Sequence, residues 1–577
     1  MALLLVGLSW TLPFFSPNFR EPIGSFYGEI TAIVLGLLAV CCLLLPSLWA
    51  GLVLPRSALV FLGFIGLILL HLLIGRNVYA QQNLLAVLYL LWALALAMLA
   101  WRLREIFGKE RVVAALCWFL LAGTLLSAAI GLCQLWGIRS PLSPFMLPQI
   151  HGRIYANTGQ PNHLANYLSL GLASLGYLYA TRRIGWLATA IALLPLLMVM
   201  GFSGSRSVWL YVPALFLLAA VFHFSSRTQA TLRLLGMTAV AGIGLLFATI
   251  LPDLLSAATP SGLETIQGRL GNEGMRSPAR MREWYEAWLM FREAPFLGIG
   301  YRRFAWHHFV LNAQLPPPRL FEGVVDNAHN LILHTMAEFG LLGLGVLLAG
   351  LLAWILGLRR GEMSMQLWWL LAVAAILGIH SMLEYPLWYA YFLGIAAVVA
   401  GLSDRVPVTV GRPGGGKLIL VTVLLLGWMA LANLYQDYRT LQSLHRAAPQ
   451  IGKGQPDKIN TAEILLDLQQ HSLLSPFVEL ALSRLMPLDR GRIEDKVALN
   501  GAVMHFAPSA DVAYRQAILL AMAGQGEQAR VQWDLAEKNF PEDAVSIIAL
   551  MRSLPEQDAA GLAELIRYSE QGMRKAQ

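Results

Sequence analysis

Residues 84–101 read LLAVLYLLWALALAMLAW, eighteen consecutive positions without a charged side chain. A helix that crosses a bilayer needs about 17 to 25 mainly apolar residues, so this run is long enough to span a membrane. Runs of similar character lie at 30–50, 58–74, 112–136, 234–251 and 418–433. The sequence therefore predicts an all-α polytopic membrane protein that contacts the lipid bilayer directly.

The composition agrees with this fold class. Of the 577 residues, 57% are hydrophobic and only 13% are charged, whereas soluble domains average about 25% charged residues. The net charge is +8. In a polytopic membrane protein an excess of Lys and Arg gathers on cytoplasmic loops, so this charge does not predict nucleic acid as a partner.

The distribution of basic residues predicts the topology. We expect thirteen spans and an N-terminus on the inside, which places fourteen Lys and Arg residues on short inner loops and five arginines on short outer loops. The C-terminal tail and the long loop 252–330 are then outside, which in a bacterial inner membrane is the periplasm. The expected spans are 2–15, 30–50, 58–74, 84–101, 112–136, 163–180, 185–201, 208–224, 234–251, 331–357, 367–383, 386–401 and 418–434.

Two domains are expected, a transmembrane domain over 1–435 that includes loop 252–330, and a periplasmic helical domain over 436–577. Within the second, Ala517, Gly524, Ala529, Trp533 and Ala536, with a proline at 541, have the spacing of one tetratricopeptide (TPR) repeat. Packing on the membrane domain and binding of a partner are both open as roles for it.

Several polar groups stand at predicted outer ends of spans, where a polar side chain is costly unless it has a role. Arg206 follows Ser205 in a very short outer turn, and its planar fork of donors suits phosphate oxygens. A snorkelling arginine is the alternative. Further polar residues precede or open the span at 163–180, namely Arg153, Gln160, Asn162 and His163.

Two more clusters belong to the same predicted face. Ser277–Trp284 predicts a helix that lies on the bilayer with its arginines near lipid headgroups. This helix could serve only as a membrane anchor, or it could contribute Arg280 and Trp284 to a site. His329 and Asn330 open the span at 331–357, where we expect Asp326 or Asn327 to cap the helix. There the helix dipole should keep the imidazole neutral and able to accept a proton. His380, Glu384 and Tyr385 form the outer turn between the next two spans.

Arginines beside a candidate base suit a lipid-anchored pyrophosphate donor and a hydroxyl acceptor. The sequence has no Asp-x-Asp, His-Glu-x-x-His or clustered Cys and His spacing, so we expect neither a metal nor a cofactor in the chemistry.

The motifs resemble those of the O-antigen ligase and polymerase superfamily (Wzy/WaaL), and more closely its bacterial O-oligosaccharyltransferases of PglL type. The resemblance covers essentially the whole chain. The pieces that support it are Leu12-Pro13-Phe14, Gly159–Ala165, Ser205-Arg206, Arg280-x-x-x-Trp284, Pro295-x-x-Gly298-x-Gly300, Ala328-His329-Asn330 and His380–Tyr389.

This resemblance implies en bloc transfer of a glycan from undecaprenyl pyrophosphate to Ser or Thr hydroxyls of a periplasmic protein such as pilin. It implies His329 as the general base, and Arg206 and Arg280 as essential arginines. Donor or acceptor would contact Arg153, Gln160, Asn162, His163, Ser205, Trp284, Asn330, His380, Glu384 and Tyr385.

Other functions remain open. An O-antigen ligase would use lipid A core as the acceptor, and a polymerase would use another glycan. A glycolipid transporter would only bind pyrophosphate, but the sequence has no clear internal repeat, and its polar groups lie at one face rather than at the midplane. A non-catalytic membrane scaffold would not require His329 beside Arg206.

Overall fold

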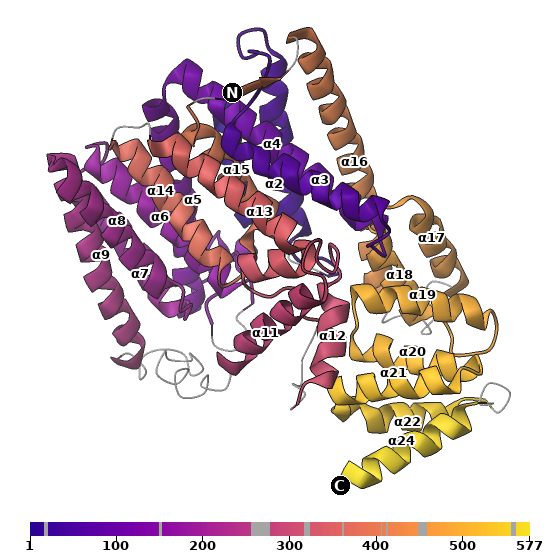
Figure 1. Ribbon diagram of the computed structural model, residues 1–577. Coiled ribbons are helices and arrows are strands. Elements are labelled where there is room, and N and C mark those ends of the chain that lie inside the picture. Colours follow the sequence, from indigo (N-terminus) through magenta and orange to yellow (C-terminus); the bar gives the residue numbers. More distant parts are fainter. Residues whose placement is uncertain are drawn as a thin grey trace.

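The computed structural model describes residues 1–16, 21–148, 153–254, 277–316, 324–359, 363–405, 407–410, 413–447, 458–555 and 561–576. A layer of long apolar helices forms the membrane domain, and a stack of shorter helices near the C-terminus lies beside one end of it (Figure 1). Within the long loop 252–330, residues 255–276 and 317–323 lie outside the described part.

The membrane domain follows the predicted order of helices. Its elements are α1 (Ala2–Ser9), η1 (Leu12–Phe15), α2 (Phe26–Cys41), η2 (Cys42–Leu44), β1 (Leu52–Leu54), η3 (Arg56–Ala58), α3 (Leu59–Leu73), α4 (Ala80–Phe107), α5 (Lys109–Trp136), η4 (Ser143–Phe145), α6 (Pro161–Ala180), α7 (Trp186–Phe202), α8 (Val208–Ser226), α9 (Gln229–Leu254), α11 (Ser277–Glu293), α12 (Phe304–Gln314), α13 (Leu331–Arg359), α14 (Met365–Ser381), η6 (Pro386–Trp388), α15 (Ala390–Ser403), β2 (Val408–Val410) and α16 (Pro413–Ala447).

Eight helices in the described residues are long and apolar enough to cross a membrane, and α7, α14 and α15 are shorter apolar helices. The polytopic all-α class is thereby confirmed, with one small addition. Strands β1 and β2 pair antiparallel, with Leu52 opposite Val410, so the loops at the predicted inner end contain a short ribbon. The count of thirteen spans stays a prediction, since α1 has only eight residues.

Helix α6 is the centre of the bundle. Nearly all of its residues are buried, including polar ones such as Asn166, Ser169 and Ser174. The hydroxyls of Ser169 and Ser174 bond back to the carbonyls of Ala165 and Leu170 one turn earlier, which satisfies them inside the bundle. Gln160 precedes the helix and Pro161 opens it, as suits a first helical position.

Helix α13 is broken at Gly340, whose φ of 61° lies in the left-handed region. The loop that follows α11 supplies hydrogen bonds at the break: the N–H groups of Leu341 and Leu342 donate to the carbonyls of Pro295 and Phe296. In return Ile299 and Gly300 donate to the carbonyls of Ala337 and Glu338. The Pro295-x-x-Gly298-x-Gly300 motif therefore pairs the backbone groups that the break releases.

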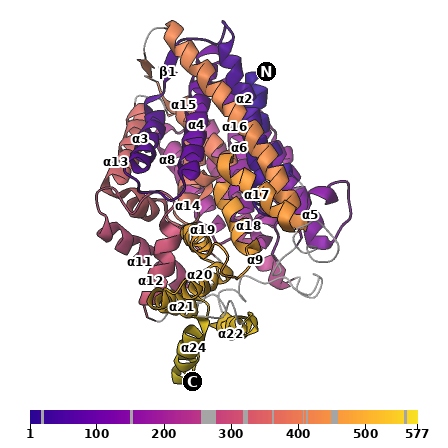
Figure 2. The same cartoon turned by 90° about the vertical axis from the view of Figure 1, so that its right-hand side faces the viewer.

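The C-terminal domain consists of α17 (Lys458–His471), α18 (Ser475–Leu485), α19 (Ile493–Phe506), α20 (Ala510–Met522), α21 (Gly526–Asn539), η8 (Pro541–Asp543), α22 (Ala544–Ser553) and α24 (Leu562–Ala576). The expected helical character is confirmed. Ala517, Ala529, Trp533 and Ala536 are fully buried between α20 and α21, while membership of the TPR family stays a prediction. The division at 435/436 falls inside α16, which runs from the membrane domain to the C-terminal helices (Figure 2).

Candidate functional site

The helix ends of α6, α8, α13 and α15 that the sequence predicted to be outer ends meet beside α11. The segments that bring polar side chains there are the start of α6, the turn between α7 and α8, helix α11, the residues before α13 and the turn between α14 and α15. Chain positions from 162 to 384 thus converge at one end of the bundle, as the sequence predicted for its outer face.

His329 lies at the centre of this convergence. Its Nδ1 is 3.1 Å from Oε2 of Glu283 on α11, and its Nε2 is 3.7 Å from Oε2 of Glu384. The His329 side chain is one-quarter exposed, whereas Glu283 and Glu384 are buried. Among the described residues, Nε2 makes no hydrogen bond, and its recorded partner is the Glu384 carboxylate at ion-pair distance.

The backbone holds His329 in an uncommon conformation. Its φ is 49°, in the left-handed region that L-residues seldom adopt outside functional or turn positions. The side chain of Asn327 accepts the backbone N–H of His329 at 2.8 Å. The cap of α13 is Asn330, whose Oδ1 accepts the N–H groups of Ile332 and Leu333 at 3.1 Å. The expected cap by Asp326 or Asn327 is therefore wrong: Asp326 pairs with Arg302 instead.

The pKa of His329 is raised above its ordinary value, contrary to the expectation from the helix dipole. Burial lowers the pKa, but the hydrogen bond with Glu283 and the nearby charge of Glu384 outweigh burial. The positive end of the helix is a weaker influence than two carboxylates in contact. His329 is therefore a stronger base than an isolated imidazole, and protonated over a wider pH range.

Glu384 joins the other side chains into one network. Its Oε1 accepts from Nη2 of Arg280 at 2.9 Å and from Nδ2 of Asn162 at 2.7 Å. The hydroxyl of Ser205 donates to Oδ1 of Asn162 at 2.8 Å. Arg280 is one-third exposed at its side chain. Arg206, next to Ser205, is exposed at the same end of the bundle.

The aromatic and histidine residues form a layer beneath this network. The Tyr385 ring lies 5.5 Å from that of His329, and burial raises the pKa of Tyr385 to about 12, so its hydroxyl stays protonated at neutral pH. His163 and His380 lie deeper, with ring centres 5.7 Å apart. Nδ1 of His380 is 2.7 Å from the hydroxyl of Tyr211. These two histidines are buried, so they pack beneath the site rather than facing its opening.

The remaining predicted residues are placed as follows. Arg153 is half-buried ahead of α6, and the carbonyl of Gln160 accepts from Leu164 at the start of that helix. Trp284 is half-buried on α11, whereas Trp288, one turn later on the same helix, is exposed. The exposed apolar stripe of α11 is Met281, Tyr285 and Trp288.

Arg280 and Arg282 of α11 do not lie along that stripe as expected for headgroup contacts. Arg280 pairs with Glu384, and Arg282 donates to Glu286 at 3.0 Å and to the carbonyl of Leu315 at 2.6 Å. Buried carboxylates and carbonyls outcompete the lipid surface for these guanidinium groups.

Sequence reasoning missed Glu283. The signal was available, because Glu283 follows Arg280 by three positions and therefore shares a helix face with it. What the sequence could not show is that this face turns toward His329, 46 positions later in the chain.

Known protein families match three parts of this chain. The family model described as "O-Antigen ligase" matches residues 168–348, "Protein glycosylation ligase" matches 154–179, and "Virulence factor membrane-bound polymerase, C-terminal" matches 368–553. A general O-oligosaccharyltransferase of Acinetobacter baylyi is 25% identical over 457 residues, which is 76% of each chain. A ComP-specific O-oligosaccharyltransferase of the same organism is 24% identical over 386 residues, 66% of this chain and 67% of that protein.

The matched family models and the two relatives support the resemblance to PglL-type O-oligosaccharyltransferases of the O-antigen ligase superfamily. The apolar helices and the membrane-bound ligase model support a multi-pass membrane protein, and the similarity to oligosaccharyltransferases supports a glycosyltransferase. The resemblance inferred from the motifs is confirmed at this level.

Proposed function

We propose that this oligosaccharyltransferase moves a preassembled glycan en bloc from undecaprenyl pyrophosphate to a Ser or Thr hydroxyl of a periplasmic protein, such as a pilin. The enzyme would lie in the bacterial inner membrane with its site on the periplasmic face. The observation that carries the proposal is the Glu283–His329 pair, in which a buried carboxylate lies within hydrogen-bond distance of Nδ1, while the nearest carboxylate oxygen to Nε2, from Glu384, is 3.7 Å away.

The chemistry follows from this pair. With Nδ1–H donated to Glu283, the lone pair of Nε2 accepts the proton of the acceptor hydroxyl. The hydroxyl oxygen then forms a bond to the anomeric carbon, and the bond from that carbon to pyrophosphate breaks with its electron pair leaving on phosphate. Attack opposite the leaving group inverts the anomeric configuration. The proton stays on His329, where Glu283 stabilises the imidazolium.

The arginines are assigned to the leaving group. A pyrophosphate gains charge as it departs, and guanidinium groups in a partly desolvated site stabilise that charge. Arg280 is held near His329 by Glu384, and Arg206 is exposed beside Ser205. This scheme uses side chains alone and routes no step through a metal.

The other predicted residues support these two groups. Asn162 and Ser205 fix Glu384, and Asn330 fixes the start of α13. Tyr385 presents a ring and a protonated hydroxyl beside the base. We assign these residues to shaping the donor and acceptor site, with Arg153, Gln160, His163, Trp284 and His380 at its edges and beneath it.

A second acceptor class is favoured by the matched families, two of which are described as an O-antigen ligase and a polymerase. The same base and arginines would serve a sugar hydroxyl on lipid A core or on a growing glycan. The acceptor therefore has to be found by experiment.

The experiment is expression of the chain in cells that make a defined undecaprenyl-linked glycan and lack other transferases for it. Mass spectrometry then examines pilin, lipid A core and free polymer. Added glycan mass on Ser or Thr of a periplasmic protein supports the proposal. Glycan on lipid A core or in polymer alone assigns the second class, and purified chain that moves no glycan to any acceptor contradicts transfer and leaves a transporter or scaffold.

A further inference from the structure

Helix α12 packs against the C-terminal domain. Trp306, Phe309 and Val310 of α12 pack into the apolar core of the C-terminal domain, which includes the buried rings of Tyr514 and Trp533. Figures 1 and 2 both show α12 beside α21. The hydrophobic core of the tail is therefore completed by a helix from the membrane domain, and a shift of one moves the other.

Asn539, at the end of α21, fixes this contact with directional bonds. Its Nδ2 donates to the carbonyl of Phe309 at 3.0 Å and to that of Leu535 at 2.8 Å. Its Oδ1 accepts from Nδ2 of Asn312 at 2.8 Å. Both asparagines are buried, so each bond is costly to leave unmade.

The other side of α12 is tied to α11 through a buried carboxylate. Oε2 of Glu286 is 2.5 Å from Nδ1 of His308 on α12, and Oε1 accepts from Nε of Arg282 at 3.0 Å. Arg282 also donates to the carbonyl of Leu315 at the end of α12. The Glu286 side chain is fully buried, so its carboxylate depends on both Arg282 and His308 as partners.

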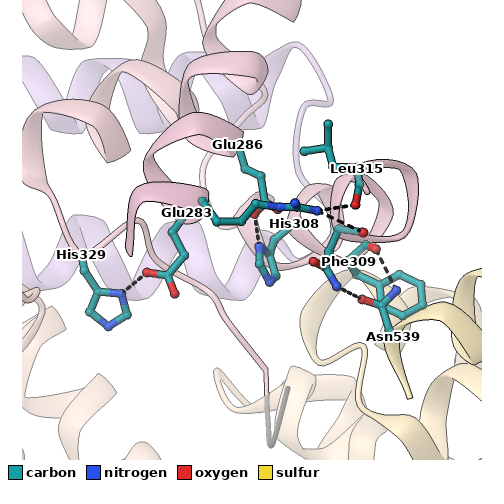
Figure 3. Close-up of polar contacts among 9 residues, drawn as sticks. Glu283, Glu286, His308, Phe309, Leu315, His329 and Asn539 are labelled. Carbon is teal, nitrogen blue, oxygen red and sulfur yellow. Dashed lines mark hydrogen bonds and ion pairs between the residues drawn. The ribbon is translucent and has the colours of Figure 1, made fainter. Parts of the chain in front are cut away.

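Glu286 and Glu283 are three residues apart on α11. Glu283 points to His329 while Glu286 points to His308 (Figure 3). Helix α11 therefore places the Glu283 carboxylate against His329, the candidate base. It places the Glu286 carboxylate against His308 of α12, the helix that packs on the C-terminal domain. Because the bond from Glu283 to His329 depends on a separation of 3.1 Å, a shift of α11 by about 1 Å would weaken it, and such misplacements can cost about 100-fold in rate.

We propose that the C-terminal domain positions the catalytic base: Asn539 holds α12, α12 holds Glu286 through His308, and α11 thereby sets Glu283 against His329. Asn539, Asn312, His308 and Glu286 are positioning residues in this scheme. The inference rests on the proposed function in that it takes His329 as the base.

Asn539→Ala tests the link, and Asn500→Ala is its matched control. Asn500 is equally buried in the same domain, donates to the carbonyl of Val512 and to Gln516, and accepts from Ser483, all within the domain. Each variant therefore loses a buried asparagine with two donated bonds and one accepted bond. Of the two variants, only Asn539→Ala removes hydrogen bonds to α12.

For the full-length protein in detergent or liposomes, we expect Asn539→Ala to lower kcat about tenfold with an unchanged KM for the donor. The acidic limb of its pH profile should move to lower pH, because His329 loses contact with Glu283; the other charged groups around the imidazole are Glu384 and Arg280. Asn500→Ala should keep kcat and the acidic limb while melting at a lower temperature. Equal profiles for the two variants would overturn the proposal.

Hydrogen exchange separates this inference from the proposed function, because it needs no turnover. Asn539→Ala should speed amide exchange in α12 and in α11, while Asn500→Ala should speed exchange only in α18–α20. Exchange in α11 that is the same in both variants would overturn the coupling even if transfer is confirmed. If Asn539→Ala does not accumulate, Asn312→Ala removes the Asn312–Asn539 hydrogen bond from the α12 side. Asn312→Ala should shift the acidic limb of the pH profile in the same direction. An acidic limb that does not move in Asn312→Ala would overturn the coupling.

Discussion

Replacing Glu283 with glutamine removes the negative charge that faces Nδ1 of His329 and keeps the size of the side chain. In the wild-type enzyme this carboxylate is buried and lies 3.1 Å from the imidazole, which is itself three-quarters buried. The amide can still accept a hydrogen bond but cannot stabilise an imidazolium to the same degree. Glu283→Gln should therefore slow the step in which His329 takes the proton.

The magnitude follows from the type of bond that is lost. A hydrogen bond to a charged group contributes about 1.5–3 kcal/mol, and each 1.36 kcal/mol in the barrier is a factor of ten in rate. Glu283→Gln should thus lower kcat about 10- to 150-fold. The pKa of His329 should fall as well, because burial lowers this pKa and the hydrogen bond with Glu283 is the largest contribution that raises it.

The assay is transfer of glycan from purified lipid-linked donor to an acceptor protein, followed from pH 5 to pH 9 at saturating donor. The acidic limb of kcat should lie at lower pH in Glu283→Gln than in the wild type. Glu293→Gln is the control, since Glu293 is exposed at the far end of α11. A kcat within twofold of wild type, together with an unmoved acidic limb, would refute the role of Glu283.

The remaining predictions concern the arginines, the broken helix, the wild-type pH profile and the topology. Arg206→Lys and Arg280→Lys should each lower kcat/KM for the donor about tenfold or more, because an ammonium cannot form a bidentate fork; full activity of the lysine variants would contradict a phosphate contact. Gly340→Ala should destabilise the fold by about 1–3 kcal/mol in thermal melts, since its Cβ would lie 2.5 Å from the Phe296 backbone at a positive φ. Gly345→Ala, whose Cβ would meet no atom within 4 Å, should be neutral or slightly stabilising. Equal melting temperatures for the two variants would refute the strain at Gly340. Wild-type transfer should fall as pH drops through the raised pKa of His329, with the acidic limb above pH 6.5; a limb below that value would contradict the raised pKa. Reporter fusions after residues 230, 320 and 440 should read inside, outside and outside, and an inside reading at 440 would contradict the thirteen-span topology.

Much of the fold could be predicted because a membrane imposes simple rules. Length and apolarity indicated the long helices, and polar residues at helix ends included Arg280, His329 and Glu384, whose side chains the structure brings together. The ribbon of β1 and β2 could not be predicted, because its three-residue strands pair across more than 350 positions and have no periodic signal.

The electrostatics of the site were harder to predict than its location. The sequence indicated a helix dipole near His329 but not which carboxylates would touch its ring, and those contacts reverse the sign of the pKa shift. Likewise, Arg282 appeared to face lipid until the structure placed Glu286 and α12 against it. Such pairings depend on how distant helices are rotated, which local patterns do not determine.

The central claim is that His329 accepts the proton of the acceptor hydroxyl, and His329→Gln tests it most directly. The purified variant, given saturating lipid-linked glycan and an acceptor protein at neutral pH, is assayed by mass spectrometry for glycosylated product and separately for donor binding. Because an amide cannot take up a proton in this range, we expect donor binding to persist while transfer is abolished. Transfer by His329→Gln at a rate close to that of the wild type would contradict the claim and move the search for the base to His163 or His380.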